Sequence, residues 1–269
     1  MPLLPWPLLL ILLALSSAAW CRPPFIEDMT TDEVQSYIAK GKATASGTTV
    51  LIYAGSTEQN GPHMVLGKHN VIAREVAAAI AQGLGNTLVY PILPFAPTGD
   101  PATRTGHMRH AGSISVSADT YARITTETAH SAKASGFRTI LLLGDHGDGQ
   151  DQLAKVAVDL DAAWASAGTR VFHVSDVYGK TIERETQTLR ARGLDPGGHA
   201  GLADTAVLMY LDRKGTLVRR AALGRAASAP GVEGDPRGAT RALGQALFNI
   251  KVETALEQIR RFQATRERL

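Results

Sequence analysis

The stretch STEQNGPHMVLGKHN, residues 56–70, contains side chains of the types that can bind metal ions. It contains one carboxylate, Glu58, and two imidazoles, His63 and His69, and glycines and a proline interrupt it. Divalent cations such as zinc and manganese bind to carboxylates and imidazoles that a rigid scaffold brings together. The stretch is too polar and too interrupted for a core element. It is therefore either a polar surface loop or one wall of a metal site.

A second group with the same chemistry follows an apolar run in LLLGDHGDGQ. His146 and Asp148 are two residues apart, and the adjacent glycines allow a turn sharp enough for both side chains to face one centre. Such polar, glycine-rich turns also occur for purely structural reasons. Two clusters at one place would favour the metal site.

Further candidates lie in TGHMRHAGSIS and GGHAGLADT. In the first, either His107 or His110 could reach the site, and a packing role suits His110 equally well. In the second, His199 stands where a helix is expected to begin, and Asp204 follows about one helical turn later. Both residues could be helix caps or site residues.

Several classes of protein are excluded or disfavoured by what the sequence lacks. There is no G-x-S-x-G motif and the single cysteine, Cys21, lies outside the expected domain, which disfavours serine or cysteine nucleophiles. No G-x-G-x-x-G follows a strand and no phosphate-binding lysine loop occurs. The net charge of +3 comes without a basic stripe, so no nucleic-acid partner is expected.

Strand-like and helix-like patterns alternate along the chain. Strands are expected at 48–55, 87–93, 138–147 and 169–178, and helices at 70–85, 117–137, 150–168, 199–212 and 240–266. Near-continuous apolar strands that alternate with helices predict an α/β fold with a parallel sheet covered on both faces. Residues 25–269 are taken as a single domain.

The polar stretches follow the predicted strands. Because the carboxyl ends of parallel strands meet at one edge of an open sheet, where ligands bind, the two metal-binding clusters are expected to converge there.

Residues 1–20 are interpreted as a signal peptide with cleavage near Ala19. The segment has a short apolar run followed by small residues, although it lacks a basic start. The mature protein is therefore expected to be exported, to the periplasm or secreted, without a stable membrane span. Cys21 is the only cysteine in the sequence, so no disulfide can form within the chain. Lipid attachment at Cys21 is a minority alternative, since Trp20 stands where a small residue is expected.

Taken together, the motifs resemble the creatininase (creatinine amidohydrolase) family. The matching pieces, in the family's order, are STEQNGPH, TGHMRHAGSISV, LLLGDHGDGQ, HAGLADT and GVEGDPRGAT. The resemblance implies a three-layer α/β fold with a mostly parallel sheet, and a homo-oligomer, often a hexamer. It also implies hydrolysis of C–N bonds with zinc or manganese, one or two ions per chain.

The resemblance assigns roles to individual residues. Glu58 and His146 match family metal ligands, and Asp148 lies where the family has a ligating Glu or a Gly. His199 matches the family's active-site histidine, and Asp204 stands where an acidic residue is expected.

Two departures change the expected metal site. Asn60 replaces a usual histidine, and His69 replaces an aspartate that bridges two metals. A carboxylate can bridge two cations, whereas one imidazole nitrogen binds a single cation. The expected ligands are then Glu58, His69, His146 and Asp148, a set that suits one metal with room for water. Replacing His69 by alanine is expected to abolish metal retention.

The function expected from these residues is metal-dependent hydrolysis of an amide, cyclic amide or formamide bond in a small molecule. The metal would activate water. His199 is the preferred acid, with Asp204 orienting it and Asp148 as an alternative proton carrier. Two other interpretations stay open. One is a non-catalytic binding protein that keeps the fold, and the other is a single-metal lactonase or deformylase.

Overall fold

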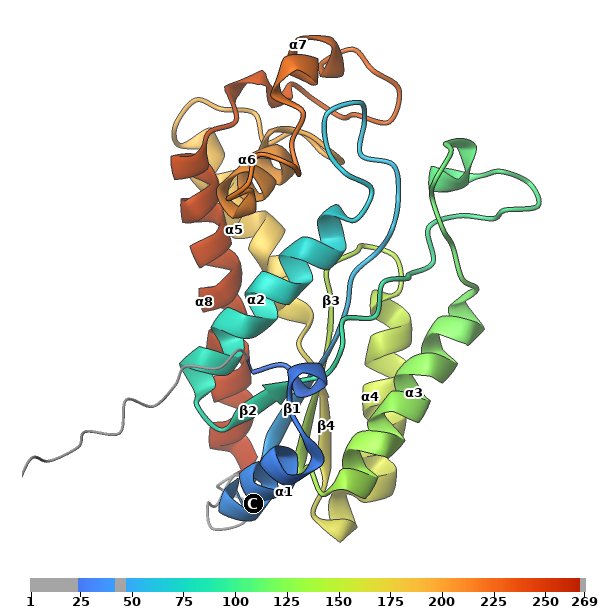
Figure 1. The fold of residues 1–269 in the computed structure, drawn as a ribbon, viewed down its shortest axis with the longest axis vertical. Coiled ribbons are helices and arrows are strands. Elements are labelled where there is room, and N and C mark those ends of the chain that lie inside the picture. Colours follow the sequence, from blue (N-terminus) through green and yellow to red (C-terminus); the bar gives the residue numbers. More distant parts are fainter. Residues whose placement is uncertain (1–23, 42–46, 267–269) are drawn as a thin grey trace, which may run out of the picture.

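A parallel sheet of four strands, in the order β2-β1-β3-β4, forms the centre of the computed structural model, which describes residues 24–41 and 47–266 (Figure 1). The strands are β1 (Thr49–Ala54), β2 (Thr87–Val89), β3 (Thr139–Gly144) and β4 (Arg170–His173). Every residue of β1 and β3 is buried, which agrees with their apolar composition and with cover on both faces.

Helices cover both faces of this sheet, and Figure 1 shows the two layers on either side of the strands. The α-helices are α1 (Thr31–Gly41), α2 (Lys68–Leu84), α3 (Ala118–Ser135), α4 (Gln150–Trp164), α5 (Gly179–Arg190), α6 (Leu202–Leu211), α7 (Leu223–Ala226) and α8 (Arg241–Arg266). Short 3-10 helices occur at Ile26–Asp28, Gly106–Arg109, Ala165–Ala167, Ser175–Val177, Arg220–Ala222 and Pro236–Gly238.

The two faces of the sheet form two hydrophobic cores because successive strand residues point to opposite sides. Leu141 and Leu143 of β3 pack into the core that α2, α5, α6 and α8 cover. Ile140 and Leu142 pack into the core that α1, α3 and α4 cover. The predicted three-layer α/β fold is therefore confirmed.

The differences from prediction lie at the ends of the elements and in three helices. The polar helices α1 and α5 and the short helix α7 were not predicted, and the last predicted strand, 169–178, ends at His173 and is followed by the 3-10 helix Ser175–Val177. Helix α5 (GKTIERETQTLR) has a polar sequence in which Leu189 is the one buried apolar residue. The sequence therefore lacks the repeating apolar pattern from which a helix is predicted.

Within the described residues, no helix has the length and apolarity needed to cross a membrane. The predicted signal peptide at 1–20 and Cys21 lie outside the described residues. Export and lipid attachment stay predictions.

Candidate metal centre

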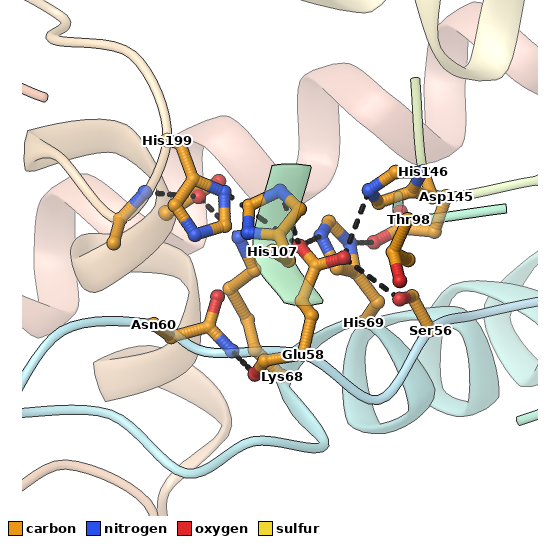
Figure 2. Close-up of polar contacts among 12 residues, drawn as sticks. Ser56, Glu58, Asn60, Lys68, His69, Thr98, His107, Asp145, His146 and His199 are labelled. Atoms are coloured by element: carbon orange, nitrogen blue, oxygen red, sulfur yellow. Dashed lines mark hydrogen bonds and ion pairs between the residues drawn. The ribbon is translucent and has the colours of Figure 1, made fainter. Parts of the chain in front are cut away.

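Glu58 lies fully buried at the centre of a cluster of four histidines (Figure 2). The nearest imidazole nitrogens are His146 Nε2, 2.8 Å from Oε2, and then His69 Nε2, His199 Nδ1 and His107 Nε2, at 3.0, 3.6 and 3.9 Å from Oε1. Ser56 Oγ donates a further hydrogen bond of 2.8 Å to Oε2. Burial alone would raise the pKa of Glu58, but the hydrogen bonds from His146 and His69 hold it well below its usual range.

These side chains come from five separate segments. Glu58 follows β1 and His146 follows β3, both at the carboxyl edge of the sheet. His69 lies in the first turn of α2, His107 in a 3-10 helix of the loop after β2, and His199 just before α6. The predicted convergence at the edge of the sheet is therefore what the fold produces.

The cluster contains two overlapping sets of possible metal ligands among the described residues. One set is Glu58, His69 and His146, and the other is Glu58, His107 and His199, each with its ligand atoms within 4.8 Å of one another. Two imidazoles and a carboxylate form a common shell for zinc, and they leave a fourth position for water.

The orientation of His69 is fixed from behind by Asp145. His69 Nδ1 lies 2.7 Å from Asp145 Oδ2, and Lys251 Nζ on α8 donates to Asp145 Oδ1 at 2.8 Å. Burial alone would raise the pKa of Asp145, but the charge of Lys251 and the hydrogen bond from His69 keep it below its usual value. An ionised Asp145 accepts the Nδ1 proton and so holds the ring with Nε2 toward the centre of the cluster. Here Nε2 donates to Glu58, and it would offer its lone pair to a cation in its place, an arrangement typical of metal-binding histidines.

His146 has backbone partners that suit either tautomer. Its Nδ1 lies 3.1 Å from the amide nitrogen of Asp148 and 3.3 Å from the carbonyl oxygen of the same residue. Nδ1 can therefore donate its proton to the carbonyl when Nε2 binds a cation.

His199 presents an unprotonated nitrogen to Glu58. Its Nε2 lies 2.8 Å from the carbonyl oxygen of Gln59, which can only accept, so the ring proton of neutral His199 is on Nε2. Burial and, after it, the nearby charge of Lys68 lower the pKa of His199 to about 4. At neutral pH, Nδ1 therefore carries a lone pair that faces the cluster.

Asp204 pairs with Lys68 and not with His199. Lys68 Nζ and the backbone amide of Ala200 both donate to Asp204 Oδ2. Burial alone would raise the pKa of Asp204, but the charge of Lys68 holds it well below its usual range. The expected orienting role of Asp204 toward His199 has no direct contact in this structure.

Only some of the site residues predicted from the sequence meet in the cluster. The structure brings Glu58, His69, His146 and His199 together, but Asp148 is exposed and its carboxylate belongs to neither ligand set. His63 lies outside both sets, with its Nε2 2.9 Å from Thr205 Oγ1.

Asn60 occupies a structural position in the loop. It is buried, and its side-chain nitrogen donates to the carbonyl oxygens of Glu58 (2.9 Å) and Val65 (3.1 Å). Asn60 therefore holds the turn that places Glu58.

Three residues of the site were not assigned from the sequence. Lys68 and Lys251 carry no motif, and Asp145 was given no role of its own beside His146. His107 was a candidate beside His110, for which a packing role suited equally well. The D-H pair directly after a strand was the one local signal for Asp145.

A cavity of about 450 Å³ opens onto the cluster, which is the size of a site for a small molecule. The cluster histidines His69, His107, His146 and His199 form one part of its wall, and Tyr178, Glu185 and Lys251 form another.

Glu185 on α5 is a buried carboxylic acid in this wall, and its Oε1 has no hydrogen-bond partner among the described residues. Burial raises the pKa of Glu185 from 4.5 to about 7, against the opposing charge of Lys251. The pKa of Glu185 is higher in the folded state than in the unfolded state. Glu185 therefore contributes fully to stability below pH 4.5, and this contribution is lost as pH rises through 7.

We therefore expect Glu185→Gln to stabilise the protein at pH 8, by up to about 3 kcal/mol, and to have no such effect at pH 4. Urea denaturation at the two pH values measures the difference. Glu183→Gln, at an exposed position of the same helix, is the control and should change stability little at either pH. An equal effect of Glu185→Gln at both pH values would contradict the assignment.

Comparison with known proteins places this chain in a family. The sequence model described as "Creatininase: Creatinine amidohydrolase" matches residues 27–259. The chain belongs to the creatininase family. The family is one of hydrolases, and the resemblance found in the motifs is thereby confirmed.

Curated relatives are "Mycofactocin precursor peptide peptidase" proteins. The protein of Mycobacterium ulcerans (strain Agy99) is 27% identical over 240 residues, covering 80% of this chain and 85% of the relative. The protein of Mycolicibacterium smegmatis is 24% identical over 246 residues, covering 82% and 87%.

Creatininase structures share the fold. A structure named "Creatininase Mn" aligns with a TM-score of 0.69 and 19% identity, covering 89% of this chain and 98% of that one. A mutant creatininase of "Zn-Zn type" aligns with a TM-score of 0.68, also at 19% identity, covering 89% and 98%.

Proposed function

We propose that this protein is a metal-dependent hydrolase that cleaves an amide C–N bond in a small molecule or a short peptide. The observation that carries the proposal is the set Glu58, His69 and His146, with the His69 ring held in place by Asp145. Carboxylate and imidazole donors suit both zinc and manganese, the metals named for the creatininase structures that share this fold.

Each residue of the set has a defined part in holding the metal. Glu58 would supply a carboxylate oxygen, and His69 and His146 would each supply Nε2. A bound divalent ion supplies an activated water at neutral pH and polarises the scissile carbonyl. The cavity holds a substrate of small-molecule size against this set.

His199 is suited to move the proton. Its Nδ1 carries the lone pair, lies 3.6 Å from Glu58 Oε1 and faces the cavity. In the proposed reaction, Nδ1 accepts a proton from the attacking water and gives it to the leaving nitrogen. The contact of Nε2 with Gln59 keeps the ring in this orientation.

Replacing His199 by alanine is expected to leave metal content unchanged and to lower turnover by on the order of 10²- to 10⁴-fold, the usual contribution of a general acid–base group. Metal analysis and steady-state kinetics measure the two effects separately. His130→Ala, at an exposed position on α3, is the control. Unchanged turnover would remove His199 from the mechanism.

The substrate class extends to peptide bonds because the curated relatives are named peptidases. The narrower expectation, a bond other than a peptide bond, has no support from these relatives. A peptide bond is itself an amide C–N bond, and the same residues serve either substrate.

The proposal is tested with metal-loaded full-length protein and a panel of cyclic amides, formamides and short peptides, with release of free amine as the measurement. Hydrolysis that chelation abolishes and that zinc or manganese restores is the expected result. A protein that contains metal and binds panel members without hydrolysing them would support the binding protein instead. Export and a hexameric assembly are further proposals from the sequence, to be tested by fractionation and by light scattering.

A further inference from the structure

Lys68 is a fully buried lysine at the first position of α2, directly before His69. Lysine is almost never fully buried unless it is paired, because removing its charge from water is costly. The first turn of a helix is also the wrong end for a cation with respect to the helix dipole. The ion pair with Asp204 offsets the cost of burial and the unfavourable helix dipole. A lysine kept at a position with these two costs points to a role in the site.

Lys68 is directed at the half of the cluster that contains His107 and His199. Figure 2 shows its side chain extending toward these two histidines, and it lines the same cavity. A divalent ion held by Glu58, His107 and His199 would therefore lie close to a fixed ammonium group in a buried environment.

His107 also has the wrong tautomer for a second metal. The Gln59 amide is oriented by two contacts, because its Oε1 accepts from the Gly61 amide at 3.0 Å and its Nε2 donates to the Gly231 carbonyl at 3.0 Å. The same Nε2 lies 3.3 Å from His107 Nδ1, which must then accept. The proton of neutral His107 is thus on Nε2, the nitrogen that faces Glu58.

We propose that the Lys68 ammonium takes the place of a second metal ion, so that this site binds a single divalent ion on Glu58, His69 and His146. Asp204, a carboxylate in the wall of the same cavity, is already paired with Lys68. The N–H groups of Lys68 and His107 then form a donor pair in the cavity for an anionic oxygen of the substrate. This inference rests on the proposed function, because it requires a metal in the first ligand set.

The test is a zinc titration of the full-length apoprotein by calorimetry, with metal content after dialysis as a second measurement. The wild type should bind about one zinc per chain. Lys68→Met removes the charge at similar volume and frees Asp204. It should bind a second zinc on the order of 100-fold more tightly than the wild type does, since the repulsion at short range is large in a protein interior. Lys68→Arg keeps the charge and should remain at about one zinc.

The outcomes separate the inference from the proposed function. Two zinc ions of similar affinity in the wild type, or a single ion in folded Lys68→Met, would overturn the role of Lys68 and leave the metal hydrolase standing. Zinc binding in none of the three proteins would overturn the proposed function as well. If Lys68→Met does not fold, the wild-type and Lys68→Arg stoichiometries still decide, because two ions in either contradict the inference.

Discussion

Glu58→Gln is expected to abolish metal retention and to lower amide hydrolysis by on the order of 1,000-fold, the equivalent of about 4 kcal/mol of transition-state stabilisation. Glu58 belongs to both possible ligand sets, and it is the one carboxylate in either. The glutamine has the same shape but offers no negative charge to a cation. Metal content after dialysis and amine release under saturating metal are the measurements.

Glu127→Gln is the matched control, because Glu127 is an exposed glutamate on α3 whose partner is exposed Arg123. Its metal content and turnover should equal those of the wild type. Full metal content in Glu58→Gln would show that the ion lies elsewhere and would contradict the candidate metal centre. Loss of metal with turnover intact would instead contradict metal-dependent chemistry.

Asp145→Asn is expected to weaken metal binding by about 10- to 100-fold, although Asp145 is in neither ligand set. The substitution removes the charge that accepts the His69 Nδ1 proton and so releases the ring orientation. It also leaves the partly buried Lys251 without its carboxylate, and because loss of one partner of a fully buried pair typically costs about 3–5 kcal/mol, we expect a loss of stability below that range. Zinc titration and urea denaturation of the apoprotein measure the two effects.

Asp148→Asn provides the comparison, because Asp148 lies three residues away with an exposed carboxylate. We expect it to keep wild-type metal affinity and stability, since His146 contacts only the backbone of Asp148. Strong loss of metal in Asp148→Asn with none in Asp145→Asn would reverse these assignments and support the ligand set expected from the sequence.

Much of the fold was predictable because the signals are local. The runs TVLIYA and TILLLG are apolar on both faces, and this composition indicates buried parallel strands wherever they occur. Ends of elements were less predictable. Strand β4 ends at His173 because the following residues form a 3-10 helix, which the apolar pattern through Val177 does not indicate.

The sequence by itself determined that carboxylate and imidazole side chains follow neighbouring strands, and hence that Glu58 and His146 meet at one edge of the sheet. Only the tertiary structure decided which other side chains join them. After β3, the Asp145 side chain points toward α2 and α8 and contacts His69 and Lys251 there. The Asp148 side chain is exposed instead. Lys251 and Lys68 reach the site from helices whose positions depend on packing, at sequence separations of 106 from Asp145 and 136 from Asp204. Contacts over such separations are fixed by the packing of whole layers, and no local pattern encodes them.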